Sequence, residues 1–156
     1  MVRKIFTAAA LLVPAATLAG VAIAGSSGKQ QRIAIVWHHQ ESTFVLTPLT
    51  PGPIRRDSGT FSACCWTRHV RTRDGQSIEI DDPTYSFSSN RGTFTWHVRT
   101  TFVFLDNDYT AASSIWKVTS GTGSYAHLEG HGRMAFVART HNDAILAKKA
   151  EGLFTL

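Results

Sequence analysis

Residues 116–132 read WKVTSGTGSYAHLEGHG and decide the fold. In the first part of this segment, aromatic or apolar residues alternate with polar ones, which is the pattern of a half-buried strand. Gly121 and Gly123 then interrupt the alternation, and we expect both to adopt positive φ angles, which glycine tolerates because it has no Cβ. Gly130 and Gly132 predict a bulge or a close backbone approach where a second strand begins. The segment therefore predicts two strands joined by a glycine-rich corner.

The chain outside this segment alternates in the same way. Residues 93–104, TFTWHVRTTFVF, form the longest such run. One face of it carries Phe94, Trp96, Val98, Phe102 and Phe104, and the other carries Thr95, His97, Arg99 and Thr101. Further candidate strands are residues 33–37, 43–47, 60–70, 77–80, 111–118, 133–139 and 144–156. Turn residues separate these runs, and Asp74-Gly75 is the strongest hairpin signal.

Eight strands with short connections favour a closed architecture. A sheet that closes on itself leaves no exposed edge, and eight strands are enough for closure. The final segment places Gly152, Phe154 and Leu156 on one face, as a strand that pairs with an early strand requires. We therefore predict an all-β fold, an eight-stranded antiparallel up-and-down β-barrel with a lipocalin-like shape. A two-sheet sandwich is the alternative.

The N-terminus predicts export. Residues 1–4 (MVRK) are positively charged, residues 5–20 are mainly apolar, and Ala22-Ile23-Ala24 fits the small-x-small rule for cleavage. We predict a signal peptide at residues 1–24, a single β-barrel domain at residues 25–156, and a secreted or periplasmic protein. On this prediction no integral membrane segment remains after cleavage. An uncleaved membrane anchor is the alternative.

Charge and histidine spacing favour neither nucleic acid nor metal. The chain has a formal net charge of +5 at pH 7, and the basic residues near Arg71 are not interleaved with stacking aromatic residues. His127 and His131 are four apart, but the intervening glycine and the strand context remove the helical geometry that this spacing needs. We expect no nucleic-acid partner, no metal and no cofactor.

The two cysteines, Cys64 and Cys65, are adjacent. Neighbouring side chains on a strand point to opposite faces, so the two thiols are poorly placed to bond with each other. We expect one buried thiol and one that is exposed or linked to a partner.

The glycine-rich corner resembles the W-K-V-x-x-G-T-G-x-Y-A-x-L-x-G-x-G signature of bacterial secreted proteins with an allene-oxide-cyclase-like barrel, and more distantly the G-G-T-G-x-F corner of plant dirigent proteins. Further matching segments follow in the same order, including FVLTPL at residues 44–49 and RDSGT at residues 56–60. The resemblance implies the barrel and a homodimer or homotrimer. It assigns no activity, because turn patterns describe how a chain bends and members of this family are mostly uncharacterised.

A large aromatic set carries the functional hypothesis. The candidate ligand-pocket residues are Trp66, Trp96, Trp116, Phe94 and Phe102. These side chains either fill the barrel or line a pocket at one of its mouths. We expect a small exported barrel that binds a small hydrophobic or aromatic molecule or acts as an oligomeric surface-interaction module. The alternatives are a cyclase-, isomerase- or dirigent-like enzyme and a structural envelope-associated protein without ligand.

Several polar residues are eligible for chemistry, but none falls in a recognisable catalytic motif. They are Glu79, Asp81, His97, Arg99, Tyr109, Tyr125 and Glu129. Strand alternation places Glu79, His97 and Arg99 opposite the aromatic face, so we expect these three to face outward. The catalytic residues, if there are any, therefore stay unassigned.

Overall fold

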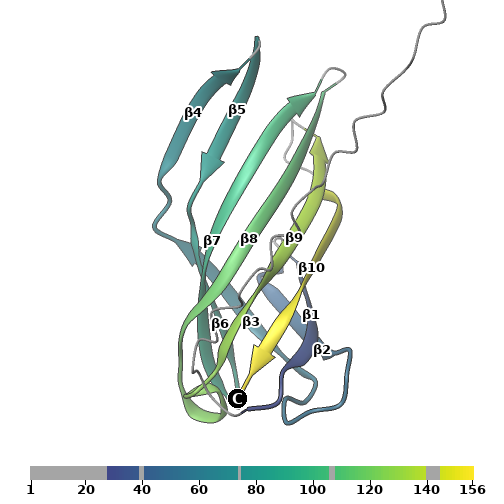
Figure 1. Cartoon of the computed structure of the whole chain (residues 1–156), viewed down its shortest axis with the longest axis vertical. Helices are drawn as coiled ribbons and strands as arrows, with labels where there is room; N and C mark the ends of the chain where they lie inside the picture. The colour runs from purple at the N-terminus through teal and green to yellow at the C-terminus, as the bar shows by residue number, and fades with distance from the viewer. Residues whose placement is uncertain (1–27, 39–40, 74, 106–107, 140–144) are drawn as a thin grey trace, which may run out of the picture.

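The computed structural model describes residues 28–38, 41–73, 75–105, 108–139 and 145–156. These residues form ten strands and one short 3₁₀ helix, η1 (Gly123–Tyr125) (Figure 1). The strands are β1 (Gln31–His38), β2 (Thr43–Pro48), β3 (Asp57–Cys64), β4 (Arg68–Arg73), β5 (Gln76–Asp81), β6 (Thr84–Ser89), β7 (Gly92–Leu105), β8 (Tyr109–Gly121), β9 (Glu129–Arg139) and β10 (Ile145–Thr155). The predicted signal peptide at residues 1–24 lies outside the described residues.

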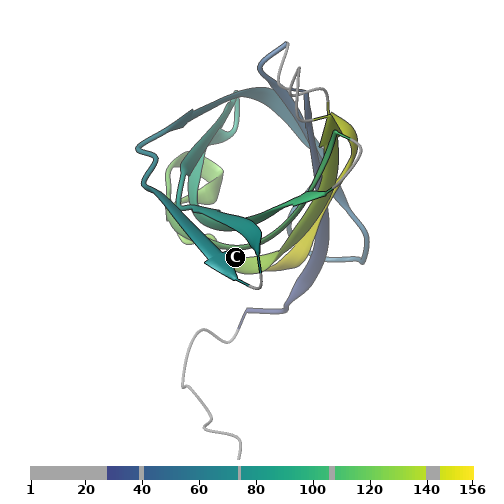
Figure 2. The ribbon, with the colours of Figure 1, turned by 90° about the horizontal axis from the view of Figure 1, so that it is seen from above.

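Eight of the strands close into an antiparallel barrel, in the order β1, β2, β3, β6, β7, β8, β9 and β10. The last strand, β10, pairs with β1, where Ile33 lies opposite Gly152. Seen from above, the strands form a ring (Figure 2). The predicted all-β barrel is confirmed, and the predicted role of the final strand in closing it is also confirmed.

The hairpin β4–β5 extends one side of the barrel beyond the ring. The first part of β7 pairs with β6, whereas residues 100–103 of β7 pair with β5. Pairing between β1 and β10 ends at Ile35 and Ala150, so β1 does not accompany β10 along its upper part. The barrel therefore has a closed half, formed by all eight strands, and an open half, formed by β4, β5, β7, β8, β9 and β10 (Figure 1).

Two strand predictions were wrong. The predicted strand at residues 60–70 is two strands, because Cys65 adopts a positive φ of 63° and ends the alternation after Cys64. No strand was predicted at Thr84–Ser89, yet β6 lies there and points Tyr85 and Phe87 inward. The serines and threonine between these rings look like turn residues, but they occupy the outward positions of a strand.

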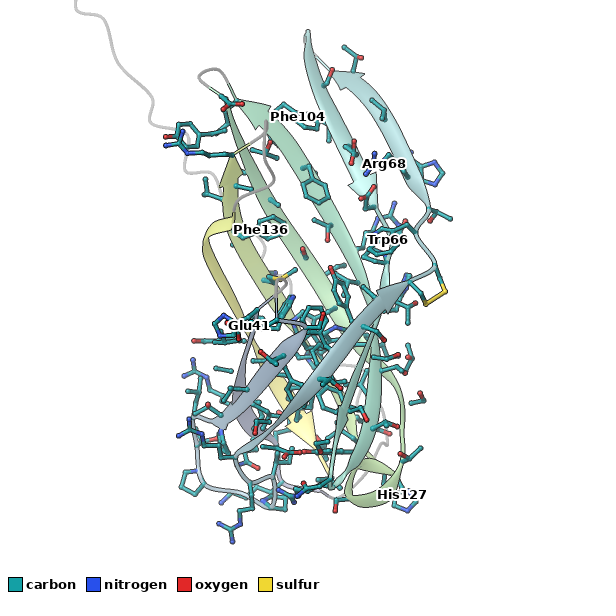
Figure 3. All side chains as sticks on the ribbon, turned by 180° about the vertical axis from the view of Figure 1, so that it is seen from behind. Glu41, Trp66, Arg68, Phe104, His127 and Phe136 are labelled. Atoms are coloured by element: carbon teal, nitrogen blue, oxygen red, sulfur yellow. A yellow bond between two sulfur atoms is a disulfide. The ribbon has the colours of Figure 1, made fainter. Side chains whose placement is uncertain are left out.

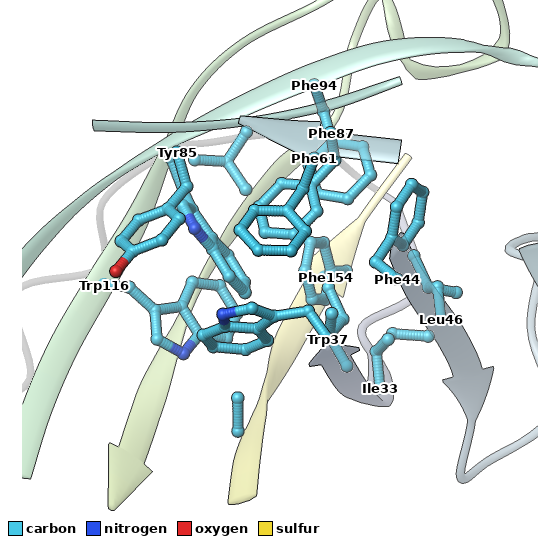
Figure 4. Close-up of a cluster of buried hydrophobic side chains, with 14 of the residues drawn as sticks. Ile33, Trp37, Phe44, Leu46, Phe61, Tyr85, Phe87, Phe94, Trp116 and Phe154 are labelled. Carbon is cyan, nitrogen blue, oxygen red and sulfur yellow. The ribbon is translucent and has the colours of Figure 1, made fainter. Parts of the chain in front are cut away.

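The hydrophobic core fills the closed half. Phe87, Phe94 and Trp96 are at most 1% exposed. The rings of Phe87 and Phe94 stack at a centroid distance of 4.8 Å, and Phe87 meets Trp96 edge-on at 4.6 Å (Figure 4). Trp37, Phe44 and other apolar residues of β1 and β2 complete the cluster. An eight-stranded barrel is just wide enough for such side chains to fill it.

Glycines make room for the largest of these rings. A Cβ on Gly132 or Gly152 would collide with the indole of Trp116, which lies across both backbones. The predicted close approach near Gly132 is therefore a ring packed on the backbone. In the corner, Gly123 has the expected positive φ of 58°. Gly121 does not have a positive φ, and it is required for a different reason, since a Cβ there would collide with the backbone oxygen of Tyr125.

Polar contacts seal the lower end of the closed half. The hydroxyl of Tyr125, which is fully buried in η1, donates a hydrogen bond to Asp57, and the Ser89 hydroxyl donates to the same carboxylate oxygen at 2.6 Å. Nearby, the amide of the buried Gln31 accepts from the backbone N–H of Ile54 at 2.8 Å and donates to the Ile54 carbonyl at 3.0 Å. These bonds hold the corner and the β2–β3 connection against the barrel.

Candidate functional site

The inner wall of the open half is defined by strand register. Residues directly opposite each other on antiparallel strands share a face. One row of such residues runs through Arg68, Asp81, Thr100, Ser114, Met134 and Ala150. Thr100, Ser114, Met134 and Ala150 are all buried, so this row faces the interior. The next inward-facing row lies closer to the open end of the barrel and contains Val70, Glu79, Phe102, Ala112 and Phe136.

The prediction that Glu79 faces outward is wrong. Glu79 lies directly opposite Phe102, so the two side chains share the inner face. Alternation within β5 or within β7 does not reveal the register between the two strands. For His97 and Arg99 the prediction is confirmed, because both are exposed and alternate with the buried Trp96 and Val98.

The open half is accessible to solvent. On its inner face Val70 is 63% exposed and Phe104 is 37% exposed, whereas Phe94 in the closed half is 1% exposed. Phe102 and Phe136 are half-buried and meet edge-on at a centroid distance of 5.8 Å. Figure 3 shows Phe104 and Phe136 in this upper part of the molecule, away from the packed lower cluster. The barrel is therefore filled along only part of its length.

A small charged cluster lies on the same inner wall. The Nε of Arg68 lies 3.0 Å from a carboxylate oxygen of Glu79 and 3.4 Å from one of Asp81. The two carboxylates are mostly covered, with side chains 15% and 6% exposed, while the Arg68 side chain is 65% exposed. Both acids are thus mostly covered, and their counter-ion comes from the neighbouring strand β4, where Arg68 lies directly opposite Asp81.

Tyr85, at the top of the packed core, is close enough to Asp81 to be affected by its charge. Burial, and then the negative charge of Asp81, raise the pKa of the Tyr85 phenol above its ordinary value. In the inward-facing row that contains Asp81, the hydroxyls of Thr100 and Ser114 form a buried hydrogen bond of 2.9 Å. The open half therefore combines apolar rings, two carboxylates and several hydroxyl groups on one concave wall.

Two buried donors lie below this wall. Within the described part of the chain, the indole N–H groups of Trp96 and Trp116 have no hydrogen-bond partner. Trp116 is two residues from Ser114 on the same strand face. A buried N–H group without a hydrogen-bond partner costs free energy. The layer just beneath the open half therefore contains two donors that lack an acceptor among the described residues.

The predicted pocket residues divide between the two halves. Phe94, Trp96 and Trp116 belong to the core of the closed half, whereas Phe102 lies on the inner wall of the open half. Trp66 is 55% exposed and lies in the break between β3 and β4 (Figure 3). The predicted pocket residues did not include Arg68, Tyr85, Thr100 or Ser114. Their only sequence signal was the alternation of their own strands, which does not identify cross-strand neighbours.

The cysteine prediction was wrong. Cys64 and Cys65 form a disulfide with each other, and both residues are exposed. Alternation does not apply to them because Cys65, with its positive φ, lies in the break and not in a strand. Elsewhere in the described residues, no group of three or more His, Cys, Asp or Glu side chains is arranged to hold a metal ion.

Comparison with known proteins finds no family model, no curated protein and no solved structure that matches this chain. In the described part of the chain no helix has the length and apolar character needed to span a membrane. The function must therefore be argued from the geometry of the barrel itself.

Proposed function

We propose that the open half of the barrel binds a small, mainly apolar or aromatic molecule. The observation that carries the proposal is the exposure of apolar side chains on the inner wall of an otherwise well-packed barrel, Val70 and Phe104 above all. Apolar surface that stays accessible on a concave wall is typical of a ligand site, because its burial by a ligand is favourable. The predicted export and the resemblance to allene-oxide-cyclase-like barrels are part of the same proposal.

The polar groups of the wall would orient such a molecule. Asp81 and Glu79 accept hydrogen bonds and Arg68 donates them, while Phe102 and Phe136 offer ring faces and edges. A mainly apolar ligand with one hydroxyl, amine or carbonyl group can therefore place its apolar part on the rings and its polar group at the carboxylate cluster.

One observation favours an enzyme as the second candidate. Asp81 is a largely buried carboxylate, and the nearby Tyr85 phenol has a raised pKa, so a carboxylate and a phenol lie near one another beside the open half. Groups of this kind serve as general acids and bases when they face a substrate. If the protein is an enzyme, we expect newly added protein to convert a molar excess of the compound that co-purifies with it. Mass spectrometry of that compound would detect the conversion.

Native mass spectrometry of the purified protein tests the binding proposal first. We expect an excess mass under gentle conditions that is lost on denaturation. A titration with the neutral fluorophore N-phenyl-1-naphthylamine then locates the site. The double variant Phe102→Ala/Phe136→Ala should weaken fluorophore binding by about thirtyfold, because it removes about 1 kcal/mol of apolar contact at each ring.

A matched control uses apolar residues of the outer surface. Val36 on β1 and Ile115 on β8 are 47% and 59% exposed and point away from the interior. The double variant Val36→Ala/Ile115→Ala should bind the fluorophore as well as the original protein does. Equal losses in both double variants, or no excess mass together with no fluorophore binding, would refute a site in the open half.

A further inference from the structure

The outer face of the barrel carries a second feature, which is independent of the open half. Two rows of outward-facing side chains cross β7, β8 and β9. One row is His97, Lys117 and His131, and the other is Arg99, Ile115 and Arg133. All six side chains are exposed, and they alternate with the buried Trp96, Val98, Trp116 and Met134. We call these six residues the basic face.

Most of the basic face is not neutralised by neighbouring acids. Arg99 lies 3.9 Å from Asp82, and among the described residues this is the one ion pair that these six side chains form. Lys117, Arg133 and both histidines form no ion pair with the described residues. Three acids border the face, Asp82 at one side, Glu129 at the lower end of β9 and Glu151 on β10, and none lies between the basic residues. Glu151 pairs with Arg32 at 3.1 Å.

The basic face is also hollowed. A surface hollow of about 470 Å³ is lined by all six of its residues together with Asp82 and the backbone at Trp116 and Gly132. The hollow forms because long basic side chains surround Gly132, which has no side chain. A linear ligand could lie in this hollow against backbone and methylene groups, with its charged groups next to the basic side chains at the rim.

We propose that the basic face binds a linear polyanion, a polysaccharide that carries sulfate or phosphate groups. Neighbouring strands are about 4.8 Å apart, and residues on one face of a strand repeat every 6.8 Å or so. Arg99 and Arg133 are therefore separated by about 10 Å across β8, and the cations form a grid that does not converge on one point. Such a grid suits several regularly spaced charges, whereas a single bound anion requires donors that converge.

Charge and surface shape distinguish this partner from two others. Ile115 is the one large apolar side chain of the basic face, which is too little for insertion into a membrane surface. A second copy of the chain would bring a second basic face, and the acids that border this face are already engaged or lie at its margin. A polyanion complements the face directly, and its binding would release counter-ions, so the affinity should fall steeply with salt concentration.

Heparin, a sulfated polysaccharide, is the probe for the experiment. Binding of the purified full chain to heparin is measured at pH 7.5 across a series of NaCl concentrations. The double variant Lys117→Ala/Arg133→Ala should reduce the slope of log affinity against log salt by about 2, one unit for each lost cation. Both residues are exposed, and unchanged thermal melts would confirm that the variant is folded.

A charge-matched control separates a site from general attraction. Arg55 and Arg56 are exposed in the β2–β3 connection, and the double variant Arg55→Ala/Arg56→Ala loses the same two charges. We expect it to keep the original slope. Equal changes in the two double variants would overturn the proposal, because net charge alone would explain the binding. Binding to anionic phospholipid vesicles but not to heparin would overturn it in favour of a membrane surface.

Discussion

The closed and open halves of this barrel share four strands, β7, β8, β9 and β10, but are filled differently. In the closed half β7 and β8 contribute Phe94, Trp96 and Trp116, all at most 3% exposed. In the open half the same two strands contribute Thr100, Ala112 and Ser114 to the interior. On β8 the change from the large ring of Trp116 to small side chains therefore occurs within a single strand, whereas β7 returns to a ring at Phe102 after Thr100. One sheet can therefore form a packed core and an accessible wall when the size of its inward residues changes along its length.

Strand pairing reinforces this difference. In the closed half every wall strand has two neighbours, whereas in the open half β4 is an edge strand and pairs with β5 alone among the described strands. The closed half thus provides the rigidity and the open half the access. Ligand sites are often built this way, with the binding wall placed beside the most stable part of the fold.

Removal of a ring from the closed half should have the largest effect on stability. Phe87 is fully buried and contacts Phe94, Trp96 and Phe44 within ring-centroid distances of 5.2 Å. Phe87→Ala leaves a cavity among rings that cannot collapse into it, so we expect a loss of about 3–5 kcal/mol in the free energy of unfolding. Urea denaturation measures this loss. A cost below about 1 kcal/mol would mean that the closed half is not a packed core.

Addition of a methyl group to the same half should have the next largest effect. A Cβ at residue 132 would collide with the Trp116 indole and with the backbone oxygen of Glu151. We expect Gly132→Ala to lower the free energy of unfolding by about 1–3 kcal/mol, which is typical of overpacking. A double-mutant cycle with Trp116→Leu checks the cause, since the smaller partner should remove part of the cost. Strict additivity of the two changes would contradict a contact between ring and glycine.

These glycines show how far the sequence can predict the structure. Alternation and glycine punctuation predicted the barrel and the inward face of β7, because both depend on residues close together in the chain. Glu79 lies opposite Phe102, and the Trp116 ring lies across Gly132 and Gly152. Both arrangements depend on which residues of different strands lie opposite each other. Register of this kind follows from the packing of the whole barrel. The wall of the open half was therefore predicted only in part.

The polar seal of the closed half should contribute less than its rings. Tyr125→Phe removes the hydrogen bond to Asp57, and we expect a cost of about 1.5 kcal/mol at neutral pH because the acceptor is charged. The pKa of Asp57, which accepts this bond, is shifted as well. Burial alone would raise the pKa of Asp57, but hydrogen bonds from Ser89, Tyr125 and the Ser58 N–H outweigh it and hold that pKa below its ordinary value of 3.8.

The pH dependence of the seal follows from the directions of these shifts. Burial first, and then the hydrogen bond and charge of Asp57, raise the pKa of Tyr125 above its ordinary value of 10. The contribution of the Tyr125 hydroxyl to stability is thus complete below about pH 10. It falls as the pH rises further, because the tyrosine ionises first in the unfolded chain. The difference in stability between the original protein and Tyr125→Phe should shrink above pH 10. Denaturation curves at pH 7, 9 and 10.5 measure it, and a constant difference would contradict the assignment.

Removal of a ring from the open half should have the smallest effect, and it is the direct counterpart of Phe87→Ala. Phe102 is half-buried, and its ring contacts Phe136 at the edge of accessible space. Phe102→Ala exposes little new surface and leaves no closed cavity, so we expect a loss of about 1 kcal/mol or less. The same change should nevertheless weaken fluorophore binding, which Phe87→Ala would affect only through unfolding. A stability cost equal to that of Phe87→Ala would show that the two halves are packed alike, and the open half would then offer no room for a ligand.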